Sequence, residues 1–444
     1  MEENRNQDNT DFMKETIKQR PLNKRKLVRR TLITAAMAVV FGLVACITFL
    51  LLEPVISNRL YPEEEPQAVV LVEETEENEI LPEDMIVDDS QIQPEPTEAP
   101  LLENEQIAQV LSEMDLDLEL GVEDYLSLLG NVKEVGKQAR KSIVTVLGVT
   151  SDVGWLDNEY ESEGAVSGVI VADNGKELLI LANINSIKDA DSIKIAFADG
   201  QEYPASMKKK DNNTGLAVIS ISKSIIQSST LEVAKAAVLG TSGSSLSGSP
   251  IIALGRPMGT EDSICYGNIT SVGNAIKLPD ANYKYMTTDI YGSVNASGVL
   301  INLNGQIVGI IDMSHNSSDL KNLISAVGIT ELKKVVESLS NDSDIAYFGV
   351  YGTDVTQEAN SKMGVPFGAY ITEIDMDSPA MDGGIQSGDV ITKLDGTEIN
   401  SYQELVKELL LREPGSEIKM ELMRHGPDGY RELELSAVLG LKPE

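Results

Sequence analysis

The sequence predicts a mainly β protein with a single membrane-spanning helix near its N-terminus and a smaller α+β domain at its C-terminus. Three observations favour this fold class. The segment from Thr31 to Leu52 is apolar and uncharged, short β-branched runs recur between residues 142 and 313, and one clear helical pattern follows at residues 402–411. Turn signals such as Asp199-Gly200 separate the β-branched runs. Short runs at this spacing are typical of a β-barrel or a β-sandwich.

The composition excludes nucleic acid as a partner. The 444 residues carry a net charge of -34, which repels phosphates. The acidic residues are concentrated, since no Lys or Arg stands between Arg59 and Lys133. The two cysteines, Cys46 and Cys265, are not expected to form a disulfide, because Cys46 lies inside the apolar run.

The segment from Thr31 to Leu52 is long enough to cross a bilayer once as a helix. The flanking charges are Lys24, Arg25, Lys26, Arg29 and Arg30 before it and Glu53 after it. By the positive-inside rule, residues 1–30 form a cytoplasmic basic tail and the later domains are extracytoplasmic, as in a bacterial envelope. A cleaved signal peptide is the competing interpretation. The apolar run is longer than a typical signal-peptide core, and no clear small-residue cleavage site follows it.

Four segments follow this predicted membrane helix. Residues 53–105 are rich in Pro and Glu, cannot bury a core and are expected to form an extended, self-repelling linker. Residues 106–131 have apolar residues at helical spacing and are expected to lead into the first folded domain. That domain spans residues 132–340 and ends in a predicted helix near residues 330–339. A second domain spans residues 345–441.

Five motifs occur in the same order as in one family of proteases. They are Ser167-Gly168-Val169-Ile170, Ala253-Leu254-Gly255-Arg256-Pro257-Met258-Gly259, Gly267-Asn268-Ile269-Thr270-Ser271, Thr288-Asp289 and Leu300-Ile301-Asn302-Leu303-Asn304-Gly305-Gln306-Ile307-Val308-Gly309-Ile310. Together these motifs resemble the HtrA family of serine proteases. The resemblance covers about residues 132–441 and implies a chymotrypsin/trypsin-like double β-barrel followed by a PDZ domain.

The resemblance also implies a catalytic His, Asp and Ser, and this sequence departs from that triad. Asn185 stands at the His position and Gly215 at the Asp position. Counting back from Leu300 places the family's Ser at Ala296. Counting forward from Thr288-Asp289 places it at Ser297. The family's glycine and proline after the nucleophile are also changed, which weakens the expected oxyanion hole. Because a Ser nucleophile needs a base, no catalytic residue is expected and the sequence predicts a pseudoprotease.

Three other side chains are candidates for a replacement base. His315 follows a strand beyond the nucleophile region, Lys188 could pair with Ser297, and His425 lies in a predicted hairpin of the second domain. We expect these three basic side chains to lie on the surface. No metal-ligand spacing occurs, so neither a metal nor a cofactor is expected. The alternative interpretation is an active serine endopeptidase of the HtrA type.

The second domain retains the parts that peptide binding needs. Its loop resembles the PDZ loop whose backbone amides hold a C-terminal carboxylate. The residues expected to bind peptide are Tyr347, Phe348, Gly349 and Val350 in that loop and Leu405, Val406 and Leu409 on the helix, where core packing is an equal alternative. Asp389 is expected to cap a turn rather than to act on a substrate.

These features predict a membrane-anchored, HtrA-like pseudoprotease with a scaffold, quality-control or regulatory role. Its expected partners are protein C-termini with an apolar last residue, or unfolded polypeptides. Because members of the family commonly form trimers, the resemblance implies a homotrimer or a hetero-oligomer with an active paralogue.

Overall fold

The computed structural model describes residues 29, 32–48, 66–71, 121–153, 159–185, 187 and 189–441. The chain divides into two compact units, residues 1–65 and residues 66–444. In the first unit, residues 32–48 are helical. Within the ranges just given, no helix combines the length and the apolar character that spanning a membrane requires. Most of the predicted tail, linker and helical lead-in lies outside the described residues.

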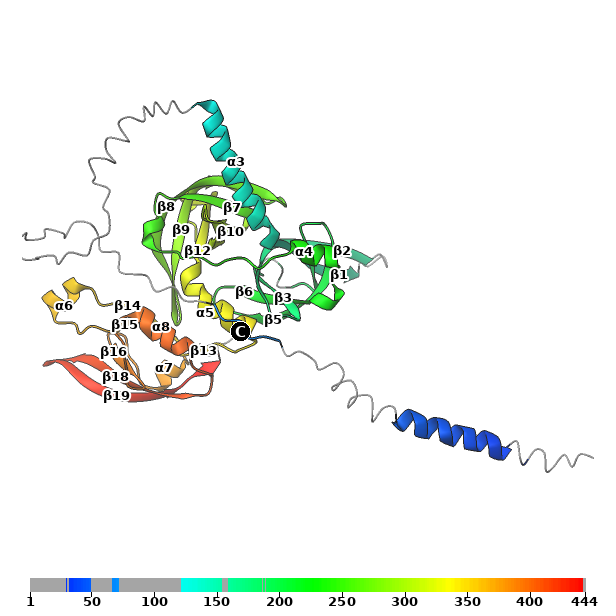
Figure 1. Ribbon diagram of the computed structural model, residues 1–444. Helices are drawn as coiled ribbons and strands as arrows, with labels where there is room; N and C mark the ends of the chain where they lie inside the picture. Colours follow the sequence, from blue (N-terminus) through cyan, green and yellow to red (C-terminus); the bar gives the residue numbers. More distant parts are fainter. Residues whose placement is uncertain are drawn as a thin grey trace, which may run out of the picture. The chain divides into compact units, whose positions relative to one another are not determined.

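The second unit begins its folded part with two closed β-barrels (Figure 1), which confirms the mainly β fold class. The first barrel has the strand order β1-β2-β3-β6-β5-β4. Its strands are β1 (Ile143–Val153), β2 (Glu159–Asp173), β3 (Glu177–Asn183), β4 (Ser192–Ala196), β5 (Glu202–Lys210) and β6 (Leu216–Ser222). All pairings are antiparallel.

The second barrel repeats this architecture with the order β10-β11-β12-β9-β8-β7. Its strands are β7 (Pro250–Arg256), β8 (Ser263–Leu278), β9 (Ala281–Tyr291), β10 (Ser297–Ile301), β11 (Ile307–Ile311) and β12 (Leu323–Gly328). The β8–β9 hairpin is the longest, and its register pairs Leu278 with Ala281 across a two-residue turn, Pro279-Asp280. This turn is important for the binding loop described below.

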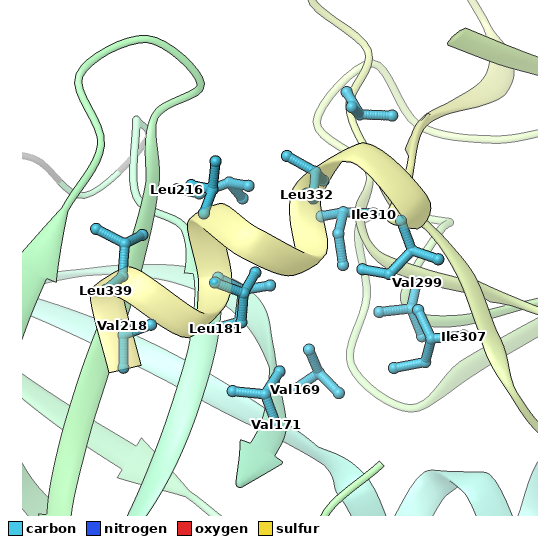
Figure 2. Packing of buried hydrophobic residues seen from close by; sticks show 14 of the residues in the cluster. Val169, Val171, Leu181, Leu216, Val218, Val299, Ile307, Ile310, Leu332 and Leu339 are labelled. Atoms are coloured by element: carbon cyan, nitrogen blue, oxygen red, sulfur yellow. The ribbon is translucent and has the colours of Figure 1, made fainter. Parts of the chain in front are cut away.

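Helix α5 (Ile329–Ser340) packs between the two barrels and confirms the helix predicted near residues 330–339. Figure 2 shows Leu332 and Leu339 of α5 together with side chains from both barrels. Leu332 is 0% and Leu339 is 1% exposed. Burying one such side chain stabilises the folded state by about 1.5–3 kcal/mol. This shared core fixes the barrels as one body and holds the cleft between them.

One helix of 18 residues and several short helical segments complete the barrel region. They are α3 (Val122–Ala139), α4 (Ser228–Val233), and the 3₁₀ turns η2 (Arg140–Ser142), η3 (Lys223–Ile225), η4 (Ser244–Leu246) and η5 (Ser318–Leu320). Helix α3 continues past the predicted lead-in, because Val132, Val135 and Ala139 pack on the barrel core. Its first turns remain exposed, as at Tyr125.

The C-terminal domain has a five-stranded path, β14-β15-β16-β18-β19, with β17 beside β16 and β13 paired to β20. Its elements are β13 (Ala346–Tyr347), β14 (Val350–Asp354), α6 (Gln357–Met363), β15 (Ala369–Ile374), α7 (Pro379–Asp382), β16 (Val390–Leu394), β17 (Thr397–Glu398), α8 (Tyr402–Leu410), β18 (Glu417–Gly426), β19 (Gly429–Val438) and β20 (Gly440–Leu441). Helix α8 confirms the helix predicted at residues 402–411. Ser401 caps it by accepting a hydrogen bond from the Glu404 N–H.

Asp389 is a structural group, as the sequence indicated. It is 0% exposed, accepts a hydrogen bond from the Gln386 N–H (2.8 Å) and pairs with Arg424 through two nitrogen–oxygen contacts of 2.7 Å. The bidentate pair ties the turn before β16 to β18.

The acidic linker predicted over residues 53–105 is not a solvated spacer throughout. Residues 66–71 lie against helix α5, where the Asn341 side chain both accepts from the Val69 N–H and donates to the Val69 carbonyl (2.8 Å each). Val69 is 9% exposed and belongs to the barrel core. The expectation that this segment buries nothing is therefore wrong here. The apolar run Ala68-Val69-Val70-Leu71 inside the acidic stretch is the signal that sequence reasoning missed.

Candidate catalytic cleft and peptide-binding loop

Asn185 and Gly215, the residues that the resemblance assigns to the His and Asp positions, lie side by side. Asn185 is exposed in the turn after β3, and Gly215 immediately precedes β6. A Cβ atom at Gly215 would come within 2.2 Å of Asn185 Nδ2. The Asn185 amide therefore fills the space that a side chain at position 215 would need. The structure thus brings together the two residues that the resemblance assigns to the His and Asp positions.

The turn that carries Gly215 is organised by a different carboxylate. Asp211 is 6% exposed and accepts hydrogen bonds from the Asn213 N–H (3.1 Å), the Thr214 N–H (3.2 Å) and the Thr214 hydroxyl (2.7 Å). Gly215 has φ +71°, a left-handed conformation that glycine adopts without strain. The Asp211 carboxylate is thus engaged within its own turn and, among the described residues, makes no hydrogen bond to Asn185.

The nucleophile region contains Ser297, but its hydroxyl is already engaged. Ser297 begins β10, is half-buried, and its Oγ accepts a hydrogen bond from the Ser167 N–H of β2 (3.0 Å). The neighbouring Ala296 N–H donates to the Ser293 carbonyl oxygen (3.1 Å). An oxyanion hole requires backbone N–H groups aimed at the substrate carbonyl. The Ala296 N–H is instead used inside its own turn.

A cavity of about 240 Å³ lies at the altered triad positions. Asn185, Gly215, Asp312 and His315 contribute to its lining, and Ser297 is not among the lining residues. His315 is exposed in the loop after β11, and its ring meets that of Tyr285 edge to face at 5.9 Å between centroids. The cleft therefore brings His315 to Asn185 and Gly215, and it does not bring Ser297 there.

Of the remaining replacement bases, His425 is not among the residues that line this cavity. Lys188 lies outside the described residues. His425 lies in β18, within the hairpin that β18 forms with β19, and its ring meets that of Tyr430 at 5.1 Å between centroids. The predicted hairpin position of His425 is confirmed.

The carboxylate-binding loop of the C-terminal domain is fully formed. Gly349 has φ +87°, and a Cβ atom there would come within 2.4 Å of Ser378 Cβ. Glycine at this position lets the backbone turn so that the N–H groups of Phe348, Gly349 and Val350 converge on one point. That point is occupied by the carboxylate of Asp280, from the β8–β9 hairpin tip.

The three apolar residues predicted on helix α8 have two different environments. Leu405 is 0% exposed and packs in the core of the C-terminal domain. Val406 and Leu409 line a cavity of about 320 Å³, together with Tyr347 and Asp280. The Tyr347 hydroxyl donates to Asp375 (2.7 Å), and burial raises the pKa of this tyrosine above its ordinary value. The cavity places an apolar pocket beside the carboxylate-binding loop.

The comparisons with known proteins agree with this architecture. Residues 166–310 match the family described as trypsin-like peptidase domain, and residues 339–435 match the PDZ domain family. The probable periplasmic serine endoprotease DegP-like of Halomonas elongata is 27% identical over 279 residues, which is 62% of this chain and 56% of that protein. The serine protease Do-like HtrA of Bacillus subtilis is 27% identical over 334 residues, or 71% of each chain.

A solved structure described as HtrA-type protease AlgW with decapeptide has a TM-score of 0.52 at 23% identity, over 70% of this chain and 99% of that one. The chain spans just over half the length of the Halomonas elongata relative. The fold and the cleft define a protein with a trypsin-like peptidase domain followed by a PDZ domain. Its homologues are HtrA-type serine proteases, which confirms the resemblance found in the sequence.

Proposed function

We propose that this chain is a membrane-anchored, HtrA-like pseudoprotease that binds extracytoplasmic peptides or unfolded proteins through its PDZ domain. The observation that carries the proposal is the contact between Asn185 and Gly215, where a catalytic site would need a base and the acid that orients it. An amide nitrogen cannot accept a proton at neutral pH. In a serine protease, removal of the triad lowers turnover about a millionfold.

The arrangement around the nucleophile supports the same proposal. The Ser297 hydroxyl accepts from the Ser167 N–H, and the Ala296 N–H donates to Ser293. Both groups thus have partners within the protein. Hydrolysis would require this turn to rearrange as well as a base to be supplied.

Membrane anchoring is part of the proposal. Its support is the apolar, uncharged run from Thr31 to Leu52 and the basic residues before it. The periplasmic relatives are consistent with extracytoplasmic domains. In this position the PDZ domain would bind exposed protein C-termini at the outer face of the membrane. Assembly as a homotrimer, or as a hetero-oligomer with an active paralogue, would add regulatory or scaffold roles.

An active serine endopeptidase is the second candidate. One observation favours it: His315 lines the same cavity as Asn185 and Gly215, so a histidine is present near the altered triad. The homologues named above are also serine endoproteases. Against it, Ser297 does not line that cavity in the described structure.

The test uses the full-length chain with unfolded casein and a fluorophosphonate probe. We expect neither cleavage nor labelling, while a catalytically competent HtrA protease run in parallel shows both. Ser297→Ala is the nucleophile variant, and Ser293→Ala is its matched control in the same turn. Labelling that Ser297→Ala abolishes and Ser293→Ala retains would overturn the pseudoprotease proposal. His315→Ala would then test the relocated base.

A further inference from the structure

The tip of the β8–β9 hairpin of the second barrel contacts the carboxylate-binding loop of the PDZ domain. The hairpin turn is Pro279-Asp280, and Asp280 has φ +56°. A proline followed by a residue with positive φ is typical of a type II turn. The turn directs the Asp280 side chain outward at the hairpin tip, toward the loop of residues 348–350.

All three loop amides donate to this one carboxylate. The Phe348 N–H donates to Asp280 Oδ2 (2.8 Å), and the Val350 N–H donates to Oδ1 (3.0 Å). The Gly349 N–H is shared between Oδ1 (2.9 Å) and Oδ2 (2.8 Å). Hydrogen bonds to a charged acceptor are about twice as strong as neutral ones. A terminal carboxylate of a peptide would use the same three donors.

Groups next to the Asp280 carboxylate also form hydrogen bonds to strand β14, as a bound peptide would. The Asp280 N–H donates to the Val350 carbonyl (2.8 Å), and the Asn282 side chain donates to the Gly352 carbonyl (3.0 Å). Both carbonyls belong to β14, which is an edge strand of its sheet. From the opposite wall, the Gln403 side chain of α8 donates to the Asn282 carbonyl (2.9 Å). The hairpin tip therefore spans the groove between β14 and α8, where an added strand would lie.

We infer that Asp280 is an internal ligand of the PDZ domain, a side-chain carboxylate that stands in for a peptide C-terminus and closes the groove. This inference rests on the proposed function, that the PDZ domain captures C-termini. Two carboxylates cannot share three N–H donors without strong repulsion. An incoming C-terminus must therefore displace Asp280, and its binding releases the β8–β9 hairpin from the loop.

The neighbouring cavity indicates which ligands displace Asp280. Val406 and Leu409 line the space of about 320 Å³ beside Asp280. The Asp280 side chain ends at its carboxylate and brings no apolar group to this space. A peptide with a free carboxylate and an apolar last side chain matches both the loop and the cavity. Such a peptide gains apolar burial that the internal ligand lacks.

The test compares Asp280→Gly with the full-length wild-type chain. Glycine adopts the positive φ of the turn without strain and removes the side chain together with its carboxylate. Asp377→Gly is the matched control, because Asp377 also has positive φ (57°) and is exposed in a turn of the PDZ domain itself. Hydrogen exchange of the amides at 348–350 reports on the internal contact with no ligand present. Fluorescence anisotropy then measures labelled decapeptides of randomised sequence ending in Val, Leu or Phe, as free acids and as C-terminal amides.

We expect the amides at 348–350 to be protected in wild type and in Asp377→Gly, and to exchange faster in Asp280→Gly. If the groove is closed in 90–99% of molecules, free-acid peptides bind Asp280→Gly about 10- to 100-fold more tightly than wild type. Equal protection and equal affinity in all three chains would overturn the internal-ligand inference and leave C-terminal capture standing. Faster exchange in Asp280→Gly with no binding of free acids, or with equal binding of acids and amides, would instead overturn the proposed function.

Discussion

The side-chain amide of Asn185 occupies the space that any side chain at Gly215 would need, with 2.2 Å between Asn185 Nδ2 and a Cβ atom at position 215. Glycine at position 215 is therefore compatible with the side chain of Asn185, whereas a larger residue there would collide with it. An Asp introduced at position 215 alone would therefore collide with the Asn185 side chain. The nucleophile turn adds a further obstacle, since the hydroxyl of Ser297 is bonded to Ser167.

Restoration of the triad side chains is expected to fail. We predict that Asn185→His, alone or combined with Gly215→Asp, leaves casein cleavage at the wild-type level. Position 215 has φ +71°, which strains an Asp residue by about 1 kcal/mol, and the Ala296 N–H remains bonded to Ser293. The measurement is casein cleavage with fluorophosphonate labelling on the same samples. Cleavage by the Asn185→His chain alone would contradict the prediction, because it would mean that nucleophile and oxyanion hole were already competent.

Gly349→Ala is expected to disable the carboxylate-binding loop. A Cβ atom there meets Ser378 Cβ at 2.4 Å, and Ser378 is 0% exposed, so the collision has little room to relax. Overpacking of this kind costs about 1–3 kcal/mol, in addition to about 1 kcal/mol for the positive φ. We predict lower thermal stability of the C-terminal domain and loss of protection of the amides at 348–350 in hydrogen exchange.

The matched control for this change is Gly384→Ala. Gly384 has φ +82° and no heavy atom within 4 Å of its Cβ position, so only the backbone strain is present. We expect it to cost about 1 kcal/mol and to leave exchange at 348–350 unchanged. Equal behaviour of the two variants would show that the close approach to Ser378 is unimportant for the loop.

The ionisation of Tyr285 is expected to lower the free energy of unfolding of the protein at alkaline pH. Burial raises the pKa of Tyr285 to about 12 from 10, and its hydroxyl lies 2.9 Å from the Asp312 carbonyl oxygen, to which it donates. The folded state therefore holds the proton more tightly than the unfolded state. The stabilisation is complete below pH 10 and is lost as the pH rises from about 10 to 12.

We predict that Tyr285→Phe flattens the fall in stability over this range. The variant should be less stable at pH 8 by about 1 kcal/mol, because a buried hydrogen bond is lost. Urea midpoints between pH 8 and 11 for both chains measure the difference in slope. Parallel curves would contradict the prediction, since the alkaline loss would then come from the other tyrosines.

Much of the fold could be predicted because its local patterns agree with its tertiary environment. The β-branched run at residues 216–221, for example, forms most of the buried strand β6. Strand β5 could not be found in this way. It contains Pro204 and three consecutive lysines, Lys208 to Lys210, and most of its side chains lie at least partly in solvent. Its position depends on pairing with β4 and β6, which is a long-range effect.

The site was partly predictable for a similar reason. The motif order singled out Asn185 and Gly215, which the structure brings together, and the loop motif singled out residues 347–350, where three backbone amides converge. The role of Asp280 could not be predicted, because the dipeptide Pro279-Asp280 is an ordinary turn signal and its partner loop lies far along the chain. The separation of Leu405 from Val406 and Leu409 likewise depends on how α8 packs against the sheet.

The ion pair between Asp389 and Arg424 is expected to be essential to the C-terminal domain. Asp389 is 0% exposed, whereas the Arg424 side chain is 24% exposed. Removing one partner of a buried pair leaves the other charge uncompensated and costs about 3–5 kcal/mol. We predict that Asp389→Asn lowers the stability of this domain by about 3 kcal/mol, because Asn still accepts from Gln386 but no longer neutralises Arg424.

Glu421→Gln is the control for charge removal. Glu421 pairs with Lys393 at 2.6 Å, but both side chains are more open to solvent, at 30% and 39% exposure. Such a pair contributes less than about 1 kcal/mol. Calorimetry of the full-length chain, at low and at high salt, measures both variants. A cost for Asp389→Asn no larger than that for Glu421→Gln would mean that solvent screens the Asp389 pair despite its burial, and that packing of α7 and β18 holds the turn without it.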